Sequence, residues 1–471
     1  MTLIRYQMNI LILSLLVISS CDFEHNHPDK TNRPNILFLL ADDLGYGELG
    51  CYGQEVIKTP ILDQLARKGM KFTNFYAGNA VCSPSRAVLM TGKQSTYCTI
   101  RGNSGYYDNE DKWYRVPLKK NEITLGEMLQ NGGYQTAFVG KWHLDDADDL
   151  STWAHSRGFE YAAQEQWTMR HGGRHYQQDV EYVNGLEDSV IYKLEEWESK
   201  DDFRTDLAIN YLDNIDEKNP FFLFMSFRAP HGHEREIGNK TLYSDAGWDK
   251  KERLHAAKIT LLDQHIGRLL DKLKDLGKLE NTLVVFTSDN GPHHEGHDPD
   301  FFNSNGPFQG YKRDMYEGGL RVPLIAYWAD KIEAGTTTDH IGSFQDFMPT
   351  LAEIARIKVP DQSNGISLLP VLKGEEAKLR NHLVWEIQLD GHWRKMPNGG
   401  FRQGVRMNKW KAVRYGVKAP TKLFDLEKDQ GELNDVSDKY PEIRDKMEEI
   451  LKSDRSDNEY FPYGGVFKIK Q

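Results

Sequence analysis

Mainly apolar runs, each followed by polar residues, recur along the first 290 residues of the chain. Four of them have the length of a buried strand and cover 36–41, 135–139, 221–227 and 282–287. Such runs are typical of parallel strands that are buried on both faces of a sheet. A further short strand is predicted at 72–76. Helices are predicted between the strands, at 60–68, 84–90, 124–132 and 252–276. This alternation predicts a doubly wound α/β domain.

From about residue 375 the pattern changes to short strands with one amphipathic helix. The strands are expected at 383–388, 401–407 and 410–413, and the helix at 441–452. The predicted fold class is therefore α/β, with a large doubly wound domain whose sheet is mixed or parallel at 33–374. A smaller C-terminal domain, an antiparallel sheet plus a helix, is expected at 375–471.

The N-terminus has the pattern of an export signal. Its apolar core, 10–18, is only nine residues long, which is too short to span a bilayer. The sequence Ile18-Ser19-Ser20-Cys21 resembles a bacterial lipobox, so a lipoprotein signal peptide is expected at 1–20, with Cys21 lipidated. A polar tether is expected at 21–32. The protein is then expected to be lipid-anchored in the bacterial cell envelope, facing the periplasm or on the cell surface. The alternative is a plain secretory signal, which predicts a secreted or periplasmic protein.

Composition changes this picture in two ways. The formal net charge of −11 argues against a nucleic-acid-binding protein, because such domains are usually basic, and an anionic substrate needs a local positive pocket. The chain has four cysteines, too few for a dense disulfide framework. Cys51 and Cys98 could pair in an oxidising envelope, but a buried free thiol is the expected state of each.

The segment 82–92 contains the strongest local signal for chemistry. Ser83 is expected to cap a helix and Pro84 to occupy its first position. Cys82 then lies just ahead of a helix N-terminus, where free backbone N–H groups and the helix dipole favour an anion. Arg86 follows about one turn later and is placed to contact the same anion. The alternative interpretation is a capped helix with a buried thiol.

This segment, Cys-Ser-Pro-Ser-Arg followed by a short apolar run and Thr-Gly, resembles the signature of the type I sulfatases of the alkaline phosphatase superfamily. The resemblance covers nearly all of 33–440; one departure is Gln-Gly-Glu at 430–432, where the family commonly has Pro-Gly-Glu. It implies that a maturation enzyme oxidises Cys82 to Cα-formylglycine, the nucleophile. It also implies that Arg86 holds that nucleophile in place.

Polar residues at the ends of the first and last apolar runs indicate a metal site. Asp42 and Asp43 follow the first run, and Asp289 and Asn290 follow the last. Because these side chains offer only oxygen atoms, they suit Ca²⁺ or Mg²⁺. Solvated turns are the alternative. The resemblance implies that all four are ligands, together with the formylglycine made from Cys82, and that the metal is calcium.

The ends of the other two runs, and one later loop, carry basic residues. Lys141 and His143 follow one run, His231 follows the other, and Lys312 precedes Tyr-Glu-Gly-Gly. By resemblance, these residues and Arg86 surround a sulfate with positive charge. A hydroxyl of the hydrated formylglycine attacks sulfur, and His231, with Lys312 as the second candidate, protonates the departing sugar oxygen. His143 then assists the step that expels sulfate.

Three segments are candidates for substrate recognition, because basic and aromatic side chains suit a charged sugar. One is 167–175, one is 392–402, and one is the long loop after Asn290, where no zinc-type histidine spacing is identified. Solvated loops are the alternative for each. The candidate residues are Arg170, His171, Arg174, His392, Trp393, Arg394, His294 and Asn303.

The sequence therefore predicts an exported sulfatase that hydrolyses sulfate esters of carbohydrates. Fragments of sulfated polysaccharides, either algal polymers such as ulvan or glycosaminoglycans, are the expected substrates. The expected partners are this carbohydrate, a formylglycine-generating maturation enzyme and, through the lipid anchor only, a membrane; no nucleic acid is expected. One alternative is a phosphoesterase or phosphonate hydrolase of the same superfamily. The other is an inactive glycan-binding surface lipoprotein.

Overall fold

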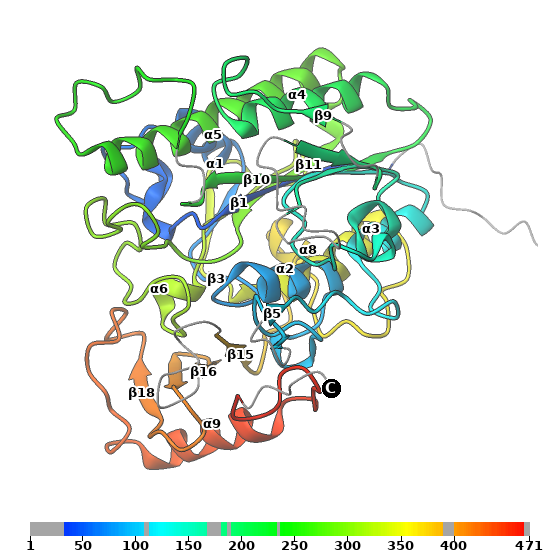
Figure 1. Ribbon diagram of the computed structural model, residues 1–471. Helices are drawn as coiled ribbons and strands as arrows, with labels where there is room; N and C mark the ends of the chain where they lie inside the picture. The colour runs from blue at the N-terminus through cyan, green and yellow to red at the C-terminus, as the bar shows by residue number, and fades with distance from the viewer. Residues whose placement is uncertain are drawn as a thin grey trace, which may run out of the picture.

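Strand β1 (Asn35–Asp42) lies in the middle of the largest sheet and is buried along its whole length. The computed structural model describes residues 33–107, 113–166, 180–185, 190–232, 236–389 and 400–465. Within them the predicted fold class is confirmed, with a large sheet between two layers of helices and a small antiparallel sheet with one helix at the C-terminal end (Figure 1). The predicted signal peptide, the tether with Cys21, and the segments 167–175 and 392–399 lie outside the described residues.

The large sheet has ten strands in the order β13-β2-β12-β11-β1-β10-β6-β7-β8-β9. Its central strands, from β11 to β7, are all parallel, and antiparallel strands extend both edges. The other strands of this sheet are β2 (Met70–Phe72), β6 (Gln135–Gly140), β7 (Tyr161–Gln164), β8 (Val180–Val183), β9 (Val190–Ile191), β10 (Phe221–Pro230), β11 (Thr282–Ser288), β12 (Leu324–Tyr327) and β13 (Thr336–Thr338).

Helices cover both faces of this sheet, as the apolar runs predicted. One face packs against α1 (Pro60–Lys68), α4 (Lys200–Asp213) and α5 (Lys250–Asp275). The opposite face packs against α2 (Cys82–Thr91), α3 (Leu125–Asn131), α7 (Phe347–Ala355) and α8 (Leu369–Leu372), so the two layers lie on either side of the strands in Figure 1. A short helix, α6 (Glu317–Leu320), lies near the smaller sheet.

Aromatic side chains from neighbouring strands stack across the second of these faces. Phe224 stands beside Phe38 in one register pair and beside Phe138 in the other. The ring centroids of Phe38 and Phe224 are 4.9 Å apart and those of Phe138 and Phe224 are 5.5 Å apart, with nearly parallel planes. Rings of this size bury a large apolar area, so this row holds three parallel strands in register.

The small sheet is sandwiched between its own helix and the large domain. It consists of β15 (Leu383–Gln388), β16 (Phe401–Met407), β17 (Trp410–Arg414) and β18 (Lys422–Asp425), with α9 (Pro441–Ser453) packed on one face. The other face packs against residues around the start of α2, and the indole of Trp385 donates to the carbonyl of Ala77 at 3.1 Å. Two further pairs are β3 (Phe75–Tyr76) with β14 (Gly342–Ser343) and β4 (Tyr106–Tyr107) with β5 (Trp113–Tyr114).

The structure corrects two expectations about local structure. The single strand expected at 72–76 is divided, because β2 pairs within the large sheet while β3 pairs with β14. The helix expected to start at Pro84 begins at Cys82 instead, with Val81 as its N-cap. Ser83 does not cap it, because its hydroxyl donates to the carbonyl of His143 at 2.6 Å.

Two further expectations concern the cysteines and the membrane. Cys51, Cys82 and Cys98 are free thiols in the structure; Cys98 is buried as expected, whereas Cys51 is only half-buried. In the part of the chain that the structure describes, no helix has both the length and the apolar composition needed to cross a bilayer.

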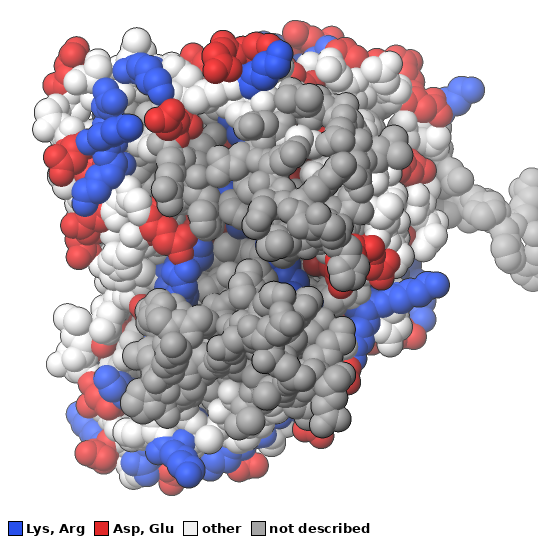
Figure 2. Space-filling view, in the orientation of Figure 1, with Lys and Arg blue, Asp and Glu red and all other residues white. Residues whose placement is uncertain are grey.

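Acidic and basic side chains are intermixed on the face shown in Figure 2, and Lys and Arg atoms are also visible in its middle, between the large domain and the small sheet.

Candidate active site

The predicted site residues come together at one edge of the large sheet. Asp42 ends β1, Lys141 follows β6, His231 follows β10, and Asp289 follows β11. Because these four strands are adjacent and parallel, their carboxyl ends lie side by side, which is where ligands bind in doubly wound folds. The N-terminal end of α2 brings Cys82 to the same place, where its Sγ lies 3.5 Å from Oδ1 of Asp42.

Arg86 ties three of these strand ends together. Its Nε donates to Oδ2 of Asp289 at 2.9 Å, and its second guanidinium nitrogen lies 3.6 Å from Asp42. Its third nitrogen donates to the carbonyl of Lys141 and to Oγ of Ser226, both at 2.6 Å. A guanidinium suits this position, because its several N–H donors lie in one plane and point to separate acceptors. The single ammonium of a lysine could not reach all of them.

Two lysines pair with the adjacent aspartates. The Nζ of Lys141 donates to both carboxylate oxygens of Asp42, at 2.8 and 2.6 Å. The Nζ of Lys312 donates to Oδ2 of Asp43 at 2.7 Å, and the amide of Asn290 donates to its Oδ1 at 2.7 Å. All of these side chains are buried, so the paired charges also offset each other's desolvation.

Burial acts differently on the three carboxylates. It raises the pKa of Asp42 and Asp43, but Lys141 and Lys312 outweigh it and the net pKa of both is lowered. Burial prevails at Asp289 and raises its pKa to about 7, although Arg86 opposes the shift. Asp289 is therefore the carboxylate of this group that gains most from an additional cation.

The backbone at Asp43 and His143 is in the left-handed region, with φ of 68° and 61°. Few residues other than glycine adopt this conformation, and it is enriched where a side chain must be presented in a required direction.

Gly291, directly after Asn290, must be a glycine for a steric reason. A Cβ atom there would lie 1.9 Å from the carbonyl oxygen of Gly318, so the Asp-Asn-Gly and Glu-Gly-Gly segments pack backbone against backbone.

The environment of Cys82 makes its thiol unreactive. The side chain is 1% exposed, and burial raises the pKa of this thiol more than Lys141 and Lys312 lower it. A protonated thiol is a poor nucleophile, since thiolate is the reactive form. The arrangement therefore does not support Cys82 as a nucleophile in its unmodified form.

His231 and Lys312 lie close together and differ in their affinity for a proton. The Nζ of Lys312 lies 3.4 Å from Nε2 of His231. Burial and the charge of Lys312 lower the pKa of His231 well below its usual value. Burial also disfavours the Lys312 ammonium, but Asp43 outweighs it and the pKa of Lys312 is raised. At neutral pH the proton of this pair is therefore on Lys312.

His143 has an imidazole that is neutral at pH 7. Burial, followed by the charges of Arg115 and Lys141, lowers its pKa well below the usual value. Its buried Nδ1 has no hydrogen-bond partner among the described residues. A neutral imidazole with a free nitrogen can accept a proton.

Some residues of this environment were not predicted. Glu295 lies 3.7 Å from Lys312 and 3.9 Å from His231. Arg228 lies near the end of β10, is buried, and pairs with buried Glu165. An arginine in the otherwise apolar run Phe221–Pro230 was a signal that could have identified Arg228. Nothing local marks Glu295, because its role depends on the loop that brings it to Lys312.

The substrate-recognition candidates are placed only in part. His294 is exposed and its ring lies 4.3 Å from that of Tyr311, the residue before Lys312, so it is close to the site. Asn303 is exposed in a turn where its carbonyl accepts from the amide of Gly306 at 2.8 Å. The other candidates lie outside the described residues; these are Arg170, His171, Arg174, His392, Trp393 and Arg394.

The oxygen-rich group fits a hard divalent cation. Asp42, Asp43 and Asp289 are buried carboxylates at one sheet edge, and the first two lie with Cys82 and His231 in a group whose ligand atoms are within 4.8 Å of one another. The buried Oδ1 of Asn290 has no hydrogen-bond partner in the described part of the chain. An all-oxygen donor set of this kind suits Ca²⁺ or Mg²⁺.

Comparisons with known proteins agree with this geometry. The family model described as Sulfatase matches residues 34–357, and the model described as N-sulphoglucosamine sulphohydrolase, C-terminal, matches residues 307–457. The N-acetylglucosamine-6-O-sulfatase of Bacteroides thetaiotaomicron is 27% identical over 94% of this chain and 89% of its own length. The N-acetylgalactosamine-6-sulfatase of Homo sapiens is 29% identical over 89% of this chain and 85% of its own length.

A solved structure gives the same result. The structure of Ps i-CgsB in complex with k-i-k-neocarrahexaose superposes with a TM-score of 0.76 at 26% identity, covering 89% of this chain and 92% of that one. The Sulfatase model alone covers more than half of the chain. The chain therefore belongs to the sulfatase family of the alkaline phosphatase superfamily and is a sulfuric ester hydrolase.

Proposed function

We propose that this protein is an exported sulfatase that removes sulfate from carbohydrates. Its site would contain Cα-formylglycine at position 82 and a divalent cation, for which calcium is the first candidate and magnesium the second. The observation that carries the proposal is the buried cluster around Cys82. There, Arg86, Lys141 and Lys312 pair with the carboxylates of Asp42, Asp43 and Asp289 at the carboxyl ends of parallel strands.

Formylglycine at position 82 would supply a hydrated aldehyde whose hydroxyl is the nucleophile toward sulfur. The structure supports the need for such a modification, because burial keeps the Cys82 thiol protonated. The first turn of α2 holds residue 82 against Asp42 and Asp43. Arg86, one turn later, stabilises the negative charge that develops there.

The cation would be held by Asp42, Asp43, Asp289 and Asn290, and it supplies Lewis-acid stabilisation of the sulfate oxygens. Lys141 and Lys312 add positive charge beside it, although each also neutralises one of the aspartates. The net charge of the cluster is therefore close to zero before the cation binds. A bound cation would add the positive excess that a sulfate ester requires in this acidic protein.

Two proton transfers are assigned to residues of this chain. The leaving sugar oxygen takes a proton from the His231–Lys312 pair, whose proton lies on Lys312 in the free protein. His143, neutral and with a free Nδ1, accepts a proton in the step that releases sulfate. Each transfer lowers the barrier of one half of the reaction.

The carbohydrate class is supported by the names of the related proteins. Two relatives are described as hexosamine 6-sulfatases, and the solved structure has a neocarrahexaose bound. We extend to this chain only the class that they share, a sulfated sugar. The sugar and the position of its sulfate can be identified by measuring desulfation of a panel of sulfated oligosaccharides, both algal and glycosaminoglycan-derived.

The modification has a direct test. The full chain is produced in a host that contains the maturation enzyme, and the tryptic peptide with residue 82 is analysed by mass spectrometry. We expect an aldehyde in place of the thiol. Finding only unmodified Cys82 in fully active enzyme would contradict the proposal.

Anchoring through Cys21 is part of the same proposal, and it rests on the lipobox-like sequence alone. Metabolic labelling with a palmitate analogue should mark the protein, and Cys21→Ala should remove the label and release the protein from membranes. Label that persists in Cys21→Ala would contradict anchoring at this residue without affecting the proposed chemistry.

A further inference from the structure

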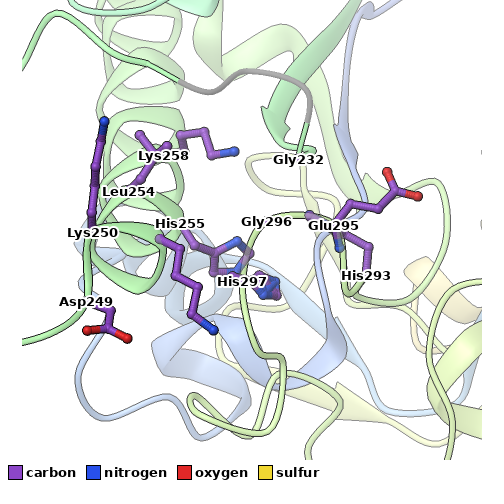
Figure 3. A pocket seen from close by; sticks show the side chains of 11 residues that line it. Gly232, Asp249, Lys250, Leu254, His255, Lys258, His293, Glu295, Gly296 and His297 are labelled. Atoms are coloured by element: carbon purple, nitrogen blue, oxygen red, sulfur yellow. The ribbon is translucent and has the colours of Figure 1, made fainter.

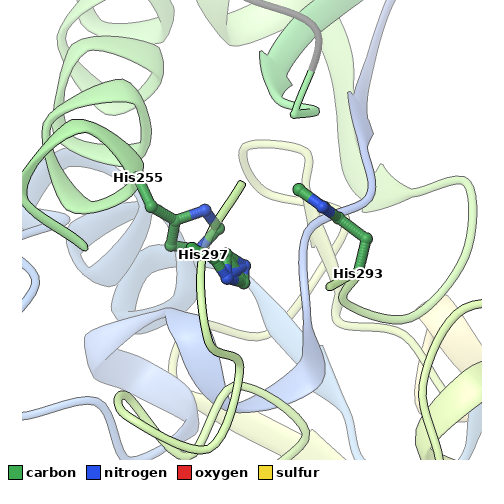
Figure 4. A group of neighbouring side chains, drawn as sticks. All are labelled: His255, His293 and His297. Carbon is green, nitrogen blue, oxygen red and sulfur yellow. The ribbon is translucent and has the colours of Figure 1, made fainter. Parts of the chain in front are cut away.

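A second group of buried side chains lies behind the active site. His255 comes from α5, and His293 and His297 come from the loop after β11 (Figure 4). They are 2%, 1% and 5% exposed. One ring nitrogen of each lies within 4.8 Å of the others, although α5 and the loop are separate in the sequence. We refer to these residues as the histidine cluster.

The protonation of His255 follows from its neighbour. Its Nε2 lies 2.5 Å from Oε1 of buried Glu48, and Oε2 of Glu48 accepts from the backbone N–H of Gly45 at 2.7 Å. Because a carboxylate accepts, Nε2 carries the proton. In the neutral ring, Nδ1 then presents a lone pair, and this buried atom has no hydrogen-bond partner among the residues described.

His297 is less satisfied still. Both of its ring nitrogens are buried, and neither has a partner within the described ranges. Its ring centroid is 3.5 Å from that of His255 and 4.7 Å from that of His293. Leaving a buried polar atom unpaired costs about 1–3 kcal/mol, and native proteins rarely leave several such atoms in one place.

His293 completes the group, but both of its ring nitrogens have protein contacts, so it must give up one of them to bind a ligand. Its Nδ1 accepts from the backbone N–H of Glu295 at 2.8 Å, and its Nε2 lies at 3.4 Å, a long distance, from the carbonyl of Pro230. Its ring also stacks at 5.9 Å on the ring of His231. The histidine cluster and the active site are therefore in contact through one pair of rings.

We propose that His255, His293 and His297 bind a transition-metal cation of the zinc class, separate from the cation of the active site. Three neutral imidazoles are a common protein ligand set for Zn²⁺, with a fourth position left for water. Glu48 has the place of the carboxylate that orients a metal-bound histidine. Calcium is disfavoured here, because it takes oxygen ligands.

The surroundings provide access for such a cation. A cavity of about 660 Å³ reaches all three histidines, and Glu295, Gly296 and Lys258 also line it (Figure 3). The Nζ of Lys258 donates to the carbonyl of His231 at 2.8 Å, which directs its charge toward the backbone. The cavity offers the water that would complete the coordination.

A metal here would join α5 to the loop that follows Asn290. That loop carries Glu295 and His293, which lie beside His231 and Lys312. The expectation that this loop has no zinc-type spacing is corrected, since His293 and His297 have the spacing His-x₃-His found in zinc sites. The third ligand was hidden because His255 is brought in only by the packing of α5.

The test is metal analysis of the full chain, produced without a histidine tag, stripped of metal, and then dialysed with Zn²⁺ and Ca²⁺. We expect one zinc per chain and a zinc-dependent rise in melting temperature. His297→Ala should abolish zinc retention, and Glu48→Gln should weaken zinc binding by about 10–100-fold. His294→Ala, in the same loop but outside the cluster, is the matched control and should retain zinc.

Three outcomes would overturn the proposal. They are wild-type protein that binds no zinc, equal zinc loss in His294→Ala and His297→Ala, and an unchanged zinc affinity in Glu48→Gln. The first of these outcomes would indicate that water occupies the cavity. Circular dichroism of each variant separates loss of zinc from loss of fold. The readout is metal content, so it is independent of sulfatase activity.

Discussion

Two buried polar clusters lie side by side in this protein, and they are satisfied in opposite ways. In the active site, each aspartate has a cationic partner from the chain itself, as Lys141 does for Asp42. In the histidine cluster, His255 and His297 have buried ring nitrogens without a partner among the described residues. The charges of the first cluster are paired before any cation binds, although Oδ1 of Asn290 has no partner in the described part of the chain, whereas the second cluster has no such charge pairing among its three rings.

This difference predicts how each cluster responds to mutation. Removing one member of a buried ion pair leaves an uncompensated charge, which is strongly destabilising. Removing an unpaired imidazole leaves no such charge. Active-site variants should therefore affect both folding and chemistry, while histidine-cluster variants should chiefly affect metal content.

The largest expected effect is on catalysis by the first cluster. Cys82→Ala removes the proposed nucleophile and should reduce kcat for a sugar sulfate on the order of 10⁶-fold, the size of loss found for other nucleophiles. Zinc content should be unchanged, because Cys82 is not part of the histidine cluster. Cys98→Ala, at another buried thiol, is the matched control and should keep its activity. Activity that survives in Cys82→Ala would remove this residue from the mechanism.

The next effect concerns the His231–Lys312 pair. A sugar alkoxide is a poor leaving group and needs a proton, whereas nitrophenolate leaves without one. Lys312→Ala and His231→Ala should therefore reduce kcat/KM for a sugar sulfate by ~10²–10⁴-fold and for nitrophenyl sulfate much less. The variant with the larger difference between substrates identifies the group that delivers the proton.

Asp289→Ala is the control for this comparison. Its carboxylate is assigned to the cation, which is needed whatever the leaving group, so both substrates should suffer alike. It should lose calcium and retain zinc. Equal losses on the two substrates in both His231→Ala and Lys312→Ala would exclude the pair from proton transfer.

Stability provides a third test of the contrast. Arg86→Ala leaves Asp289 buried without its guanidinium partner and should lower the free energy of unfolding by about 3–5 kcal/mol. In metal-free protein, His297→Ala should change it by less than about 1 kcal/mol, because lost packing is offset by removing an unpaired polar group. Urea unfolding midpoints of both variants check this, and equal destabilisation would show that the two clusters are alike.

The last test concerns a buried histidine that does have a partner. Nε2 of His265 lies 3.0 Å from the hydroxyl of Ser199, which caps α4. Burial lowers the pKa of His265 from 6.5 to about 4. Below pH 6.5 the unfolded chain therefore binds a proton that the folded chain excludes.

Stability should accordingly fall as the pH drops from 6.5 toward 4, by on the order of 3 kcal/mol from this residue. Unfolding midpoints across this pH range measure the slope. His265→Gln should flatten the slope by that amount. An unaltered slope in His265→Gln would show that this histidine is not held neutral by the fold.

Local patterns in the sequence determined the main elements of this fold. The apolar runs predicted β1, β6, β10 and β11 closely, and the helix expected at 60–68 matches α1. Strand burial and helix periodicity depend on neighbouring residues, so they can be identified without the tertiary structure. The segment at 82–92, the Asp-Asp pair at 42–43 and the Asp-Asn pair at 289–290 likewise marked the chemistry before any contact was known.

Only the tertiary structure decided which residues meet. The order of strands in the sheet brings Asp42 beside Asp289, 247 positions later, and divides the strand expected at 72–76 between two sheets. The packing of α5 carries His255 to His293 and His297, and a loop carries Glu295 to Lys312. These contacts join segments far apart in the chain, and no local periodicity records them, because they depend on how buried faces pack against each other.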